Sequence, residues 1–343
     1  MGKTNIEWTD KSWQPLVGCS PVSDGCDNCY AARDAAGRLQ NHPDYAGLTE
    51  KGRYGVTRYN GKTRLLEKRL DQPLRWRKPC RIFVCSMGDL FHESVPFEYI
   101  GKVFAVMYAA HKHTFQVLTK RPTRMLEFLS EWNFSESMKW LLASKEINYR
   151  LGGRDPFNLW QDHPLPNVWL GVSAENQKTA DSRVPLLLIA PAALRFVSVE
   201  PILGPVDLTR LHFEDITNVN ALTGHHGVTL PLEGLGNSLD QVIVGGESGR
   251  CGRAMHPEWA RSLQKQCADA GTAFFFKQWG RWYPDDRGGC MYMNNGYVES
   301  QMEGVEAELM TNYGGKSAAG DLLDGKQYHE FPEESNVASQ AGL

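Results

Sequence analysis

Residues 81–92 read Arg81-Ile-Phe-Val-Cys85-Ser-Met-Gly-Asp89-Leu-Phe-His92, a short apolar run that ends in small and polar residues. A helical pattern follows from Pro96 to about His111, with apolar side chains at helical spacing. Five more apolar runs share this form, and most of them precede a helical pattern. They are residues 114–118, 167–170, 194–197, 241–244 and 273–276. Short continuous apolar runs that alternate with helices are typical of parallel strands buried on both faces.

This alternation predicts an α/β fold. Residues 5–17 add a short strand at the N-terminus, and polar residues follow the end of each predicted strand. The active sites of α/β barrels and of open α/β sheets lie at the carboxyl ends of their strands. We therefore expect a full or partial (β/α) TIM-like barrel, with a doubly wound sheet as the alternative.

The barrel pattern extends over residues 1–283, and three stretches interrupt it. We expect insertions near 41–80, 136–166 and 211–238, because these stretches do not follow the strand–helix alternation. Residues 284–343 are polar and rich in glycine. They are expected to form a C-terminal extension that wraps the barrel at first and frays later.

The composition is that of a globular protein, with 41% hydrophobic and 22% charged residues among 343. No apolar run approaches the roughly 18 residues that a membrane span needs, and the first residues lack a signal-peptide core. We expect a cytoplasmic protein that does not enter a membrane. Eight cysteines in a chain of this length do not suggest a secreted disulfide framework.

The net charge of −3 gives no global basic field, but residues 51–81 contain eleven lysines and arginines. Tyr54, Tyr59 and Trp76 are interleaved among these cations. Aromatic side chains among cations can stack on bases while the charges neutralise phosphates. The stretch is therefore either a nucleic-acid contact or the solvated face of a lid or helix.

Three thiols lie in the loop after the first predicted strand. Cys19, Cys26 and Cys29 are separated by six and then by two residues. Three thiolates can hold a metal or a cluster and leave one coordination position open, as metal chemistry requires. Zinc would need a fourth ligand, and the chain has no second CxxC; thiols without a metal are a third interpretation. We favour an iron–sulfur cluster.

This motif, CxxxxxxCxxC followed by Tyr30, resembles that of the radical S-adenosylmethionine superfamily. The usual spacing there is CxxxCxxC with an aromatic-containing position after it, so the first gap is three residues longer here. From residue 5 to about 283 the chain also resembles a phage- and prophage-encoded family of three-cysteine proteins, regarded as radical-SAM-like. The phrases that carry this resemblance are Trp8-Thr-Asp-Lys-Ser-Trp13, Gly25-Cys26-Asp-Asn-Cys29-Tyr30, Ser86-Met-Gly-Asp89, Leu118-Thr-Lys-Arg-Pro122, Trp169-Leu-Gly-Val-Ser173, Ser198-Val-Glu-Pro201, Gly245-Gly-Glu-Ser-Gly249 and Phe275-Phe-Lys-Gln-Trp-Gly280.

The resemblance implies a [4Fe–4S] cluster whose open iron chelates S-adenosylmethionine. One electron from an external donor would cleave the sulfonium and give a 5′-deoxyadenosyl radical, which abstracts hydrogen from the substrate. These cofactors carry the difficult chemistry, while the protein supplies position and excludes water. The expected protein is a radical-SAM-like enzyme that acts on a nucleic-acid-related or other anionic substrate, with no partner protein identified.

Residues at the strand ends are expected to bind the cofactor. Gly88 would permit close approach and Asp89 would accept a charged hydrogen bond, where superfamily members place a Gly-Gly-Glu. The alternatives are a glycine turn with a capping Asp89, and a helix cap at Ser173 to Asn176. The expected cofactor-binding residues are Tyr30, Ser86, Met87, Gly88, Asp89, Ser173, Glu175, Asn176, Glu200, Gly245, Gly246 and Glu247.

Four more residues are expected to act in catalysis or on the substrate: His92, Lys120, Arg121 and Lys277. A cation inside a pocket needs a carboxylate partner, such as Glu200 or Glu247, or an anionic substrate. We favour the substrate for Lys120 and Arg121. His92 is either a proton donor or a structural histidine.

Two other functions remain open. The first is a zinc-stabilised nucleic-acid-binding protein that uses residues 51–81 and turns over no S-adenosylmethionine. The second is a barrel hydrolase with Asp89, Glu175 and Glu200 as acid and base, although no GxSxG motif supports it.

Overall fold

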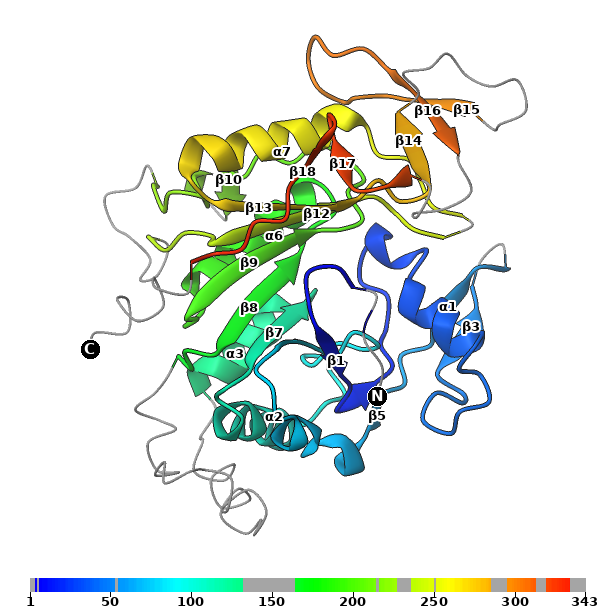
Figure 1. Cartoon of the computed structure of the whole chain (residues 1–343), viewed down its shortest axis with the longest axis vertical. Helices are drawn as coiled ribbons and strands as arrows, with labels where there is room; N and C mark the ends of the chain where they lie inside the picture. The colour runs from blue at the N-terminus through cyan, green and yellow to red at the C-terminus, as the bar shows by residue number, and fades with distance from the viewer. Residues whose placement is uncertain are drawn as a thin grey trace.

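Seven strands form one parallel sheet that curls into a half-barrel in this computed structural model (Figure 1). The structure describes residues 4, 6–52, 55–131, 164–213, 216–226, 236–249, 251–284, 295–312 and 319–333. The strands of the sheet, in spatial order, are β1 (Lys11–Trp13), β6 (Arg81–Val84), β7 (Thr114–Thr119), β8 (Val168–Ser173), β9 (Leu194–Val199), β12 (Gln241–Gly245) and β13 (Ala273–Gln278).

The strand order follows the chain order, and each strand is parallel to its neighbours. A doubly wound sheet would reverse its order at a switch point, so that alternative is wrong. A closed barrel is also wrong, because β1 and β13 are the two edges of the sheet and do not pair. The partial barrel is therefore confirmed.

Helices follow four of the strands and pack on the outer face of the sheet. They are α2 (Phe97–Ala109), α3 (Pro122–Glu131), α6 (Gln177–Ile189) and α7 (Pro257–Ala270). The continuous apolar runs of the strands explain this arrangement. Outward-facing side chains such as Val84 and Val117 join helix residues such as Ile100 and Leu263 in one buried core.

The inner face of the half-barrel is filled by rings near the middle of the strands. Phe83, Trp169, Phe196 and Phe275 pack there in one buried cluster. Gly171 makes this packing fit, because a Cβ at that position would come within 2.5 Å of the Phe196 ring. The apolar layer therefore closes the base, and the polar residues beyond it face the space at the carboxyl ends.

A C-terminal segment covers the free edge of β13. The Phe276 amide donates to the Tyr328 carbonyl at 2.8 Å, and the Glu330 amide donates to the Phe274 carbonyl at 3.2 Å. His329 stacks on Phe275 with ring centroids 4.4 Å apart. The segment thus runs antiparallel to β13 and supplies the hydrogen-bond partners that an edge strand lacks.

Smaller elements surround the half-barrel, and they include parts of the predicted insertions near 41–80 and 211–238. Residues 136–163 of the predicted insertion near 136–166 lie outside the described residues. The smaller elements are α1 (Tyr30–Ala36), the pairs β2 (Leu16–Val17) with β5 (Arg64–Leu65), β3 (Thr49–Lys51) with β4 (Thr57–Tyr59), β10 (Leu211–Phe213) with β11 (Ile216–Val219) and β17 (Leu322–Leu323) with β18 (Lys326–Gln327), the sheet β14 (Trp282–Pro284)–β16 (Glu308–Asn312)–β15 (Asn295–Val298), and the 3₁₀ turns η1 (Asp24–Cys26), η3 (Glu67–Arg69) and η4 (Gln72–Arg75).

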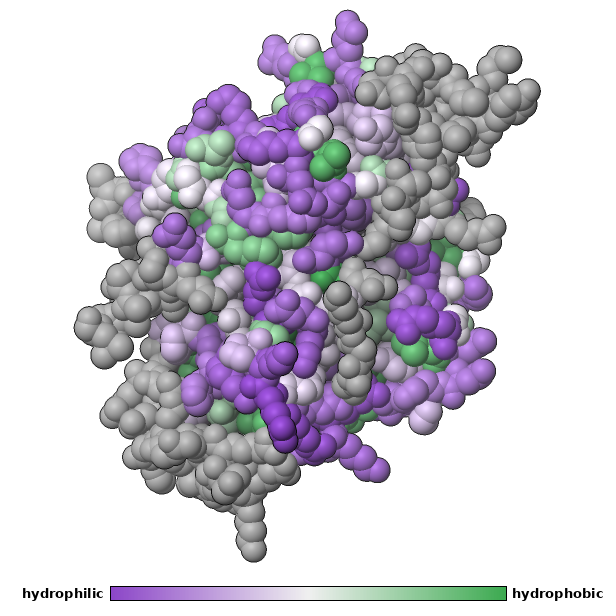
Figure 2. Space-filling view, viewed as in Figure 1, coloured by the Kyte–Doolittle hydropathy of each residue, from purple (hydrophilic) through white to green (hydrophobic). Residues whose placement is uncertain are grey.

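The face of the molecule in Figure 2 is mainly hydrophilic, and its apolar residues are scattered. Within the described part of the chain, no helix combines the length and the apolar character needed to cross a lipid bilayer. The prediction that the protein does not span a membrane by a helix agrees with this finding.

Candidate metal and cofactor site

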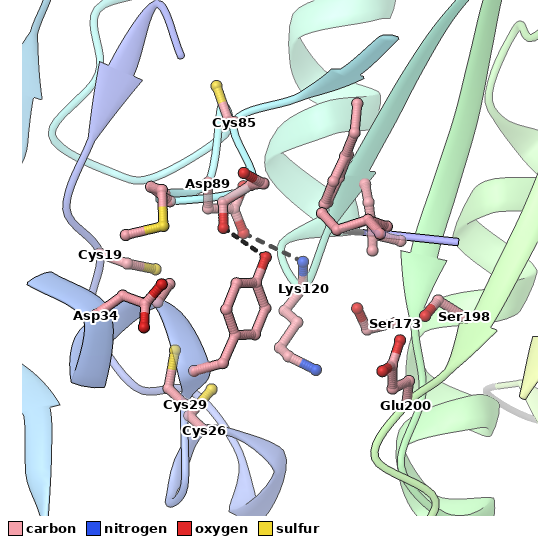
Figure 3. A pocket seen from close by; sticks show the side chains of 18 of the residues that line it. Cys19, Cys26, Cys29, Asp34, Cys85, Asp89, Lys120, Ser173, Ser198 and Glu200 are labelled. Carbon is pink, nitrogen blue, oxygen red and sulfur yellow. Dashed lines mark hydrogen bonds between the residues drawn. The ribbon is translucent and has the colours of Figure 1, made fainter. Parts of the chain in front are cut away.

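A cavity of about 910 Å³ lies at the carboxyl ends of the parallel strands. The cysteine loop, residues 18–30, forms one side of it, and the ends of β8, β9 and β13 form another. Figure 3 shows Cys19, Cys26 and Cys29 across the cavity from Glu200, with Lys120 between the two sides. The topology therefore brings together residues that are up to about 260 positions apart, because parallel strands end at one edge of the sheet.

All three thiols of the loop are free and line this cavity. Burial and the nearby Asp89 carboxylate raise the pKa of Cys19 to about 12, and burial also raises the pKa of Cys29. Among the described residues, no group of three or more His, Cys, Asp or Glu side chains is arranged to hold a metal ion. The loop therefore offers three sulfur donors but not a preassembled site for a single ion.

Arg121, which follows the end of β7, connects the cysteine loop to the sheet. Its side chain is buried, and Nη1 lies 3.5 Å from Cys19 Sγ and 3.1 Å from Asp89 Oδ2. Nη2 donates to the carbonyl and to the hydroxyl of Ser20, and Nε donates to Glu93 at 2.8 Å. These neighbouring carboxylates raise the pKa of Arg121 despite the opposing effect of burial, so the group is a permanent cation beside a thiol.

Glu175 holds the middle of the loop from the end of β8. The carboxylate is fully buried and accepts hydrogen bonds from Lys120, from Arg183 at 3.1 Å and from Ser23 Oγ at 2.9 Å. Burial raises the pKa of Glu175, but the two cations outweigh burial and lower it. Gly25 passes so close that a Cβ there would lie 2.4 Å from the Glu175 side chain.

Glu247 holds the far end of the loop from the glycine-rich turn after β12. It is buried and accepts hydrogen bonds from Asn28 Nδ2 at 2.9 Å and from the Arg253 guanidinium at 2.6 Å. Arg253 also donates to the Asp24 carbonyl at 2.7 Å. Two of the three glutamates predicted to bind a cofactor, Glu175 and Glu247, thus have their oxygens engaged inside the protein.

Asp89 is likewise saturated. Its carboxylate accepts from Thr119 Oγ1 at 2.7 Å, from Arg121 and from the amides of Phe91 and Lys120. Gly88 permits a close approach, as expected, but to the cysteine loop: a Cβ at Gly88 would lie 2.9 Å from the Gly18 carbonyl. This turn therefore supports the loop from beneath.

The neighbouring residues of this turn also line the cavity. Tyr30 donates to the Ser86 carbonyl at 2.6 Å, and the Met87 amide donates to Gln14 Oε1 at 3.1 Å. Tyr30, Ser86 and Met87 all line the cavity, as does Gly246, whereas Gly245 does not. The Tyr30 contact fixes the first turn of α1 against the strand end of β6, and the Met87 contact joins the residues that follow β6 and β1.

The opposite wall of the cavity has polar groups with no hydrogen-bond partner among the residues that the structure describes. Lys277 Nζ donates to Glu200 Oε1 at 2.6 Å, and both side chains are only partly buried. Among the described residues, no hydrogen bond occupies Glu200 Oε2 or the hydroxyls of Ser173 and Ser198. This wall can donate and accept hydrogen bonds to a ligand in the cavity.

Besides Glu175 and Gly245, two more predicted site residues, His92 and Asn176, do not line the cavity. His92 is buried behind the cysteine loop, where Nε2 lies 3.0 Å from Ser20 Oγ. Burial and the positive charge of Arg121 lower the pKa of His92. Asn176 caps α6 through its hydrogen bond from the Thr179 amide at 3.1 Å. The helix-cap alternative thus accounts for the contacts of Asn176.

Several cations of the basic stretch 51–81 are engaged in internal contacts. Arg64 donates to the carbonyls of Pro43 and Ala46, and others form ion pairs. The ion pairs are Arg58 with Glu50, Arg69 with Asp44, Arg75 with Asp71 and Arg81 with Asp10. These pairs reduce the positive charge that the stretch presents to a nucleic acid.

Sequence reasoning missed several residues of the site. Ser198 precedes the predicted site residue Glu200 by two positions, so the period of two along a strand would have predicted it. Ser12, in β1, and Gln14, directly after β1, also line the cavity and were not predicted. Arg183 and Arg253 neutralise the buried glutamates. The sequence pattern does not mark them as site residues, because each lies in a polar helical or loop segment.

A half-barrel of parallel strands, with a three-thiol loop and a polar cavity at the carboxyl ends, defines an α/β protein with a candidate thiol-ligated cofactor site. A family model described as "Protein of unknown function (DUF5131)" matches residues 3–332, and the chain belongs to this family. No curated protein and no solved structure matches the chain.

Proposed function

We propose that this protein is a radical-SAM-like iron–sulfur enzyme of the phage three-cysteine type. One observation carries the proposal: the three free thiols of one loop line the same cavity as the polar ends of the parallel strands. Thiols placed only for stability would not need a cavity beside them. A volume of about 910 Å³ is at the upper end for small-molecule sites, so a cofactor and a substrate can both fit.

The donor set fits a [4Fe–4S] cluster held by Cys19, Cys26 and Cys29. The cysteine ligands of a cluster bind different iron atoms, so their sulfurs are spaced more widely than the ligands of one ion. The loop offers three such thiols, and all of them are free and line the cavity. Arg121 and Lys120 lie on the same side of the cavity and supply positive charge beside the thiolates.

When bound, the cluster and S-adenosylmethionine would supply the electron and the radical precursor. The residues of the chain bind and orient the ligands. Ser173, Ser198 and Glu200 offer hydroxyls and a carboxylate oxygen that have no hydrogen bond to any described residue, and they face the thiols across the cavity. We propose that this wall holds the polar part of a ligand while the loop side holds the cluster.

The proposed substrate is nucleic-acid-related or otherwise anionic. Lys277 is the strand-end cation best placed to contact it, because its ammonium has three N–H groups and, among the described residues, one acceptor, Glu200. Lys120 and Arg121 are less suited, since buried carboxylates already neutralise both.

Anaerobic reconstitution with iron and sulfide tests the proposal. We expect about four irons per chain, an electron paramagnetic resonance signal after reduction, and 5′-deoxyadenosine when dithionite and S-adenosylmethionine are added. Cys26→Ala should lose the cluster, whereas Cys251→Ala, which changes an exposed free thiol outside the loop, should keep it. Stoichiometric zinc in place of iron in protein purified without oxygen would instead support the zinc-stabilised alternative.

A further inference from the structure

The buried Arg121 side chain has five N–H groups, and the structure gives each of them an acceptor. Four of these acceptors are oxygens, and the fifth is Cys19 Sγ at 3.5 Å from Nη1. Cys19 is one of the three proposed cluster ligands. The guanidinium therefore contacts a ligand sulfur directly and has no N–H left for a substrate.

The surroundings fix Arg121 in this position. The Ser94 amide donates to His92 Nδ1 at 3.2 Å, so Nδ1 is an acceptor and Nε2 carries the proton toward Ser20 Oγ. That hydroxyl is one of the acceptors of Arg121 at 2.7 Å. A neutral His92 thus orients Ser20, and Ser20 orients the arginine, as the outer residues of metal sites commonly do.

We propose that Arg121 is a positioning residue that makes the cluster easier to reduce by placing positive charge against the sulfur of Cys19. The inference rests on the proposed function. Reduction adds one negative charge to a thiolate-ligated cluster, and a buried cation stabilises that form because solvent screens it little. Hydrogen bonds to the sulfurs are among the features that set cluster potentials.

Two carboxylates oppose the effect of Arg121 to different degrees. Asp89 is buried and shares the same nitrogen, Nη1, whereas Glu93 contacts Nε with a side chain that is 64% exposed. Removing the Glu93 charge would leave Arg121 less neutralised. Removing the Arg121 charge would leave Asp89 uncompensated near the sulfur. The two changes should therefore shift the midpoint potential in opposite directions.

The test is a redox titration of the reconstituted protein, followed by electron paramagnetic resonance, with iron content measured for each variant. At a fixed potential, Arg121→Gln should lower the ratio of reduced to oxidised cluster about tenfold, which is about 59 mV for one electron. Glu93→Gln should raise the ratio about twofold. Arg121→Lys keeps the charge and should lie between wild type and Arg121→Gln.

Arg253→Gln is the matched control, because Arg253 also binds the cysteine loop but, among the described residues, donates only to oxygens. Its ratio should change less than that of Arg121→Gln. An iron-loaded Arg121→Gln protein with an unchanged midpoint would overturn the inference and leave the proposed function standing. If Arg121→Gln does not fold, a downward shift in Glu93→Gln, whose carboxylate is exposed, would overturn it equally. A wild-type protein that binds no iron would overturn both.

Discussion

Replacing Glu175 by glutamine should destabilise the protein strongly, although the two side chains have nearly the same shape. The carboxylate is 1% exposed and pairs with Lys120 and Arg183, whose side chains are 19% and 8% exposed. Removing one partner of a buried ion pair typically costs 3–5 kcal/mol, because the remaining charges lose their counter-charge. Lys120 can still reach water in the cavity, so we expect about 3 kcal/mol, the lower end of that range.

Urea unfolding of the metal-free chain measures this loss. With an m value of about 3 kcal/mol/M, the midpoint of Glu175→Gln should fall by about 1 M. Glu93→Gln is the control, because it also removes a carboxylate from a cation but at an exposed position. That change should cost at most about 1 kcal/mol. Equal losses in the two variants would refute the reasoning that burial decides the cost.

The pH dependence of unfolding gives a second test of whether the ionised Glu175 carboxylate stabilises the fold. The pKa of Glu175 is lower in the folded chain than its ordinary value of 4.5, because Lys120 and Arg183 outweigh burial. The stability from this carboxylate is therefore fully present above pH 4.5 and is lost as the pH falls through the folded-state pKa. The difference between wild type and Glu175→Gln should shrink in acid, and a difference that grows there would contradict the assignment.

Three further predictions concern the apolar layer inside the half-barrel, the cavity wall around Lys277 and the cysteine loop. Gly171→Ala should cost about 1–3 kcal/mol in urea unfolding, because the new methyl meets the Phe196 ring, and Phe196→Leu should restore part of the loss. Lys277→Met should lower kcat/KM for 5′-deoxyadenosine formation by about 10- to 100-fold by removing a charged hydrogen-bond donor beside Glu200, with little change in melting temperature. Stripping the reconstituted protein with a chelator should lower its melting temperature, because a cluster bound to the native loop adds stability; an unchanged temperature would indicate that the loop is already rigid.

The strands could be predicted from the sequence because their signal is local. Runs such as Phe274 to Phe276 are buried on both faces, and a continuous apolar run is the expected pattern for such a strand. No local sequence pattern indicates whether the barrel is closed or open. It depends on whether the edges of β1 and β13 meet, and the segment on the edge of β13, Tyr328 to Glu330, is polar and does not read as a strand.

The location of the site could be predicted from the sequence, but the ion pairs between its side chains could not. Strand-end residues such as Ser173, Glu200 and Lys277 do line one cavity with the cysteines. The sequence also indicates that a cation there needs a counter-charge, and Lys277 finds one of the two carboxylates expected, Glu200. It does not show that Lys120 pairs with Glu175, because which side chains meet depends on how the loop folds over the strand ends.

The close contact between Gly25 and Glu175 links the length of the cysteine loop to a residue on a distant strand. The long first gap of the motif contains Ser23 and Gly25, and both lie against that carboxylate. A related protein with a shorter gap would keep the buried Glu175 carboxylate and its two cations but would lose the hydrogen bond from the Ser23 hydroxyl. Evolution would then have to replace loop and strand end together. In an alignment of the family, we expect a small residue at position 25 wherever a glutamate occupies position 175, and the loss of both wherever the gap contracts.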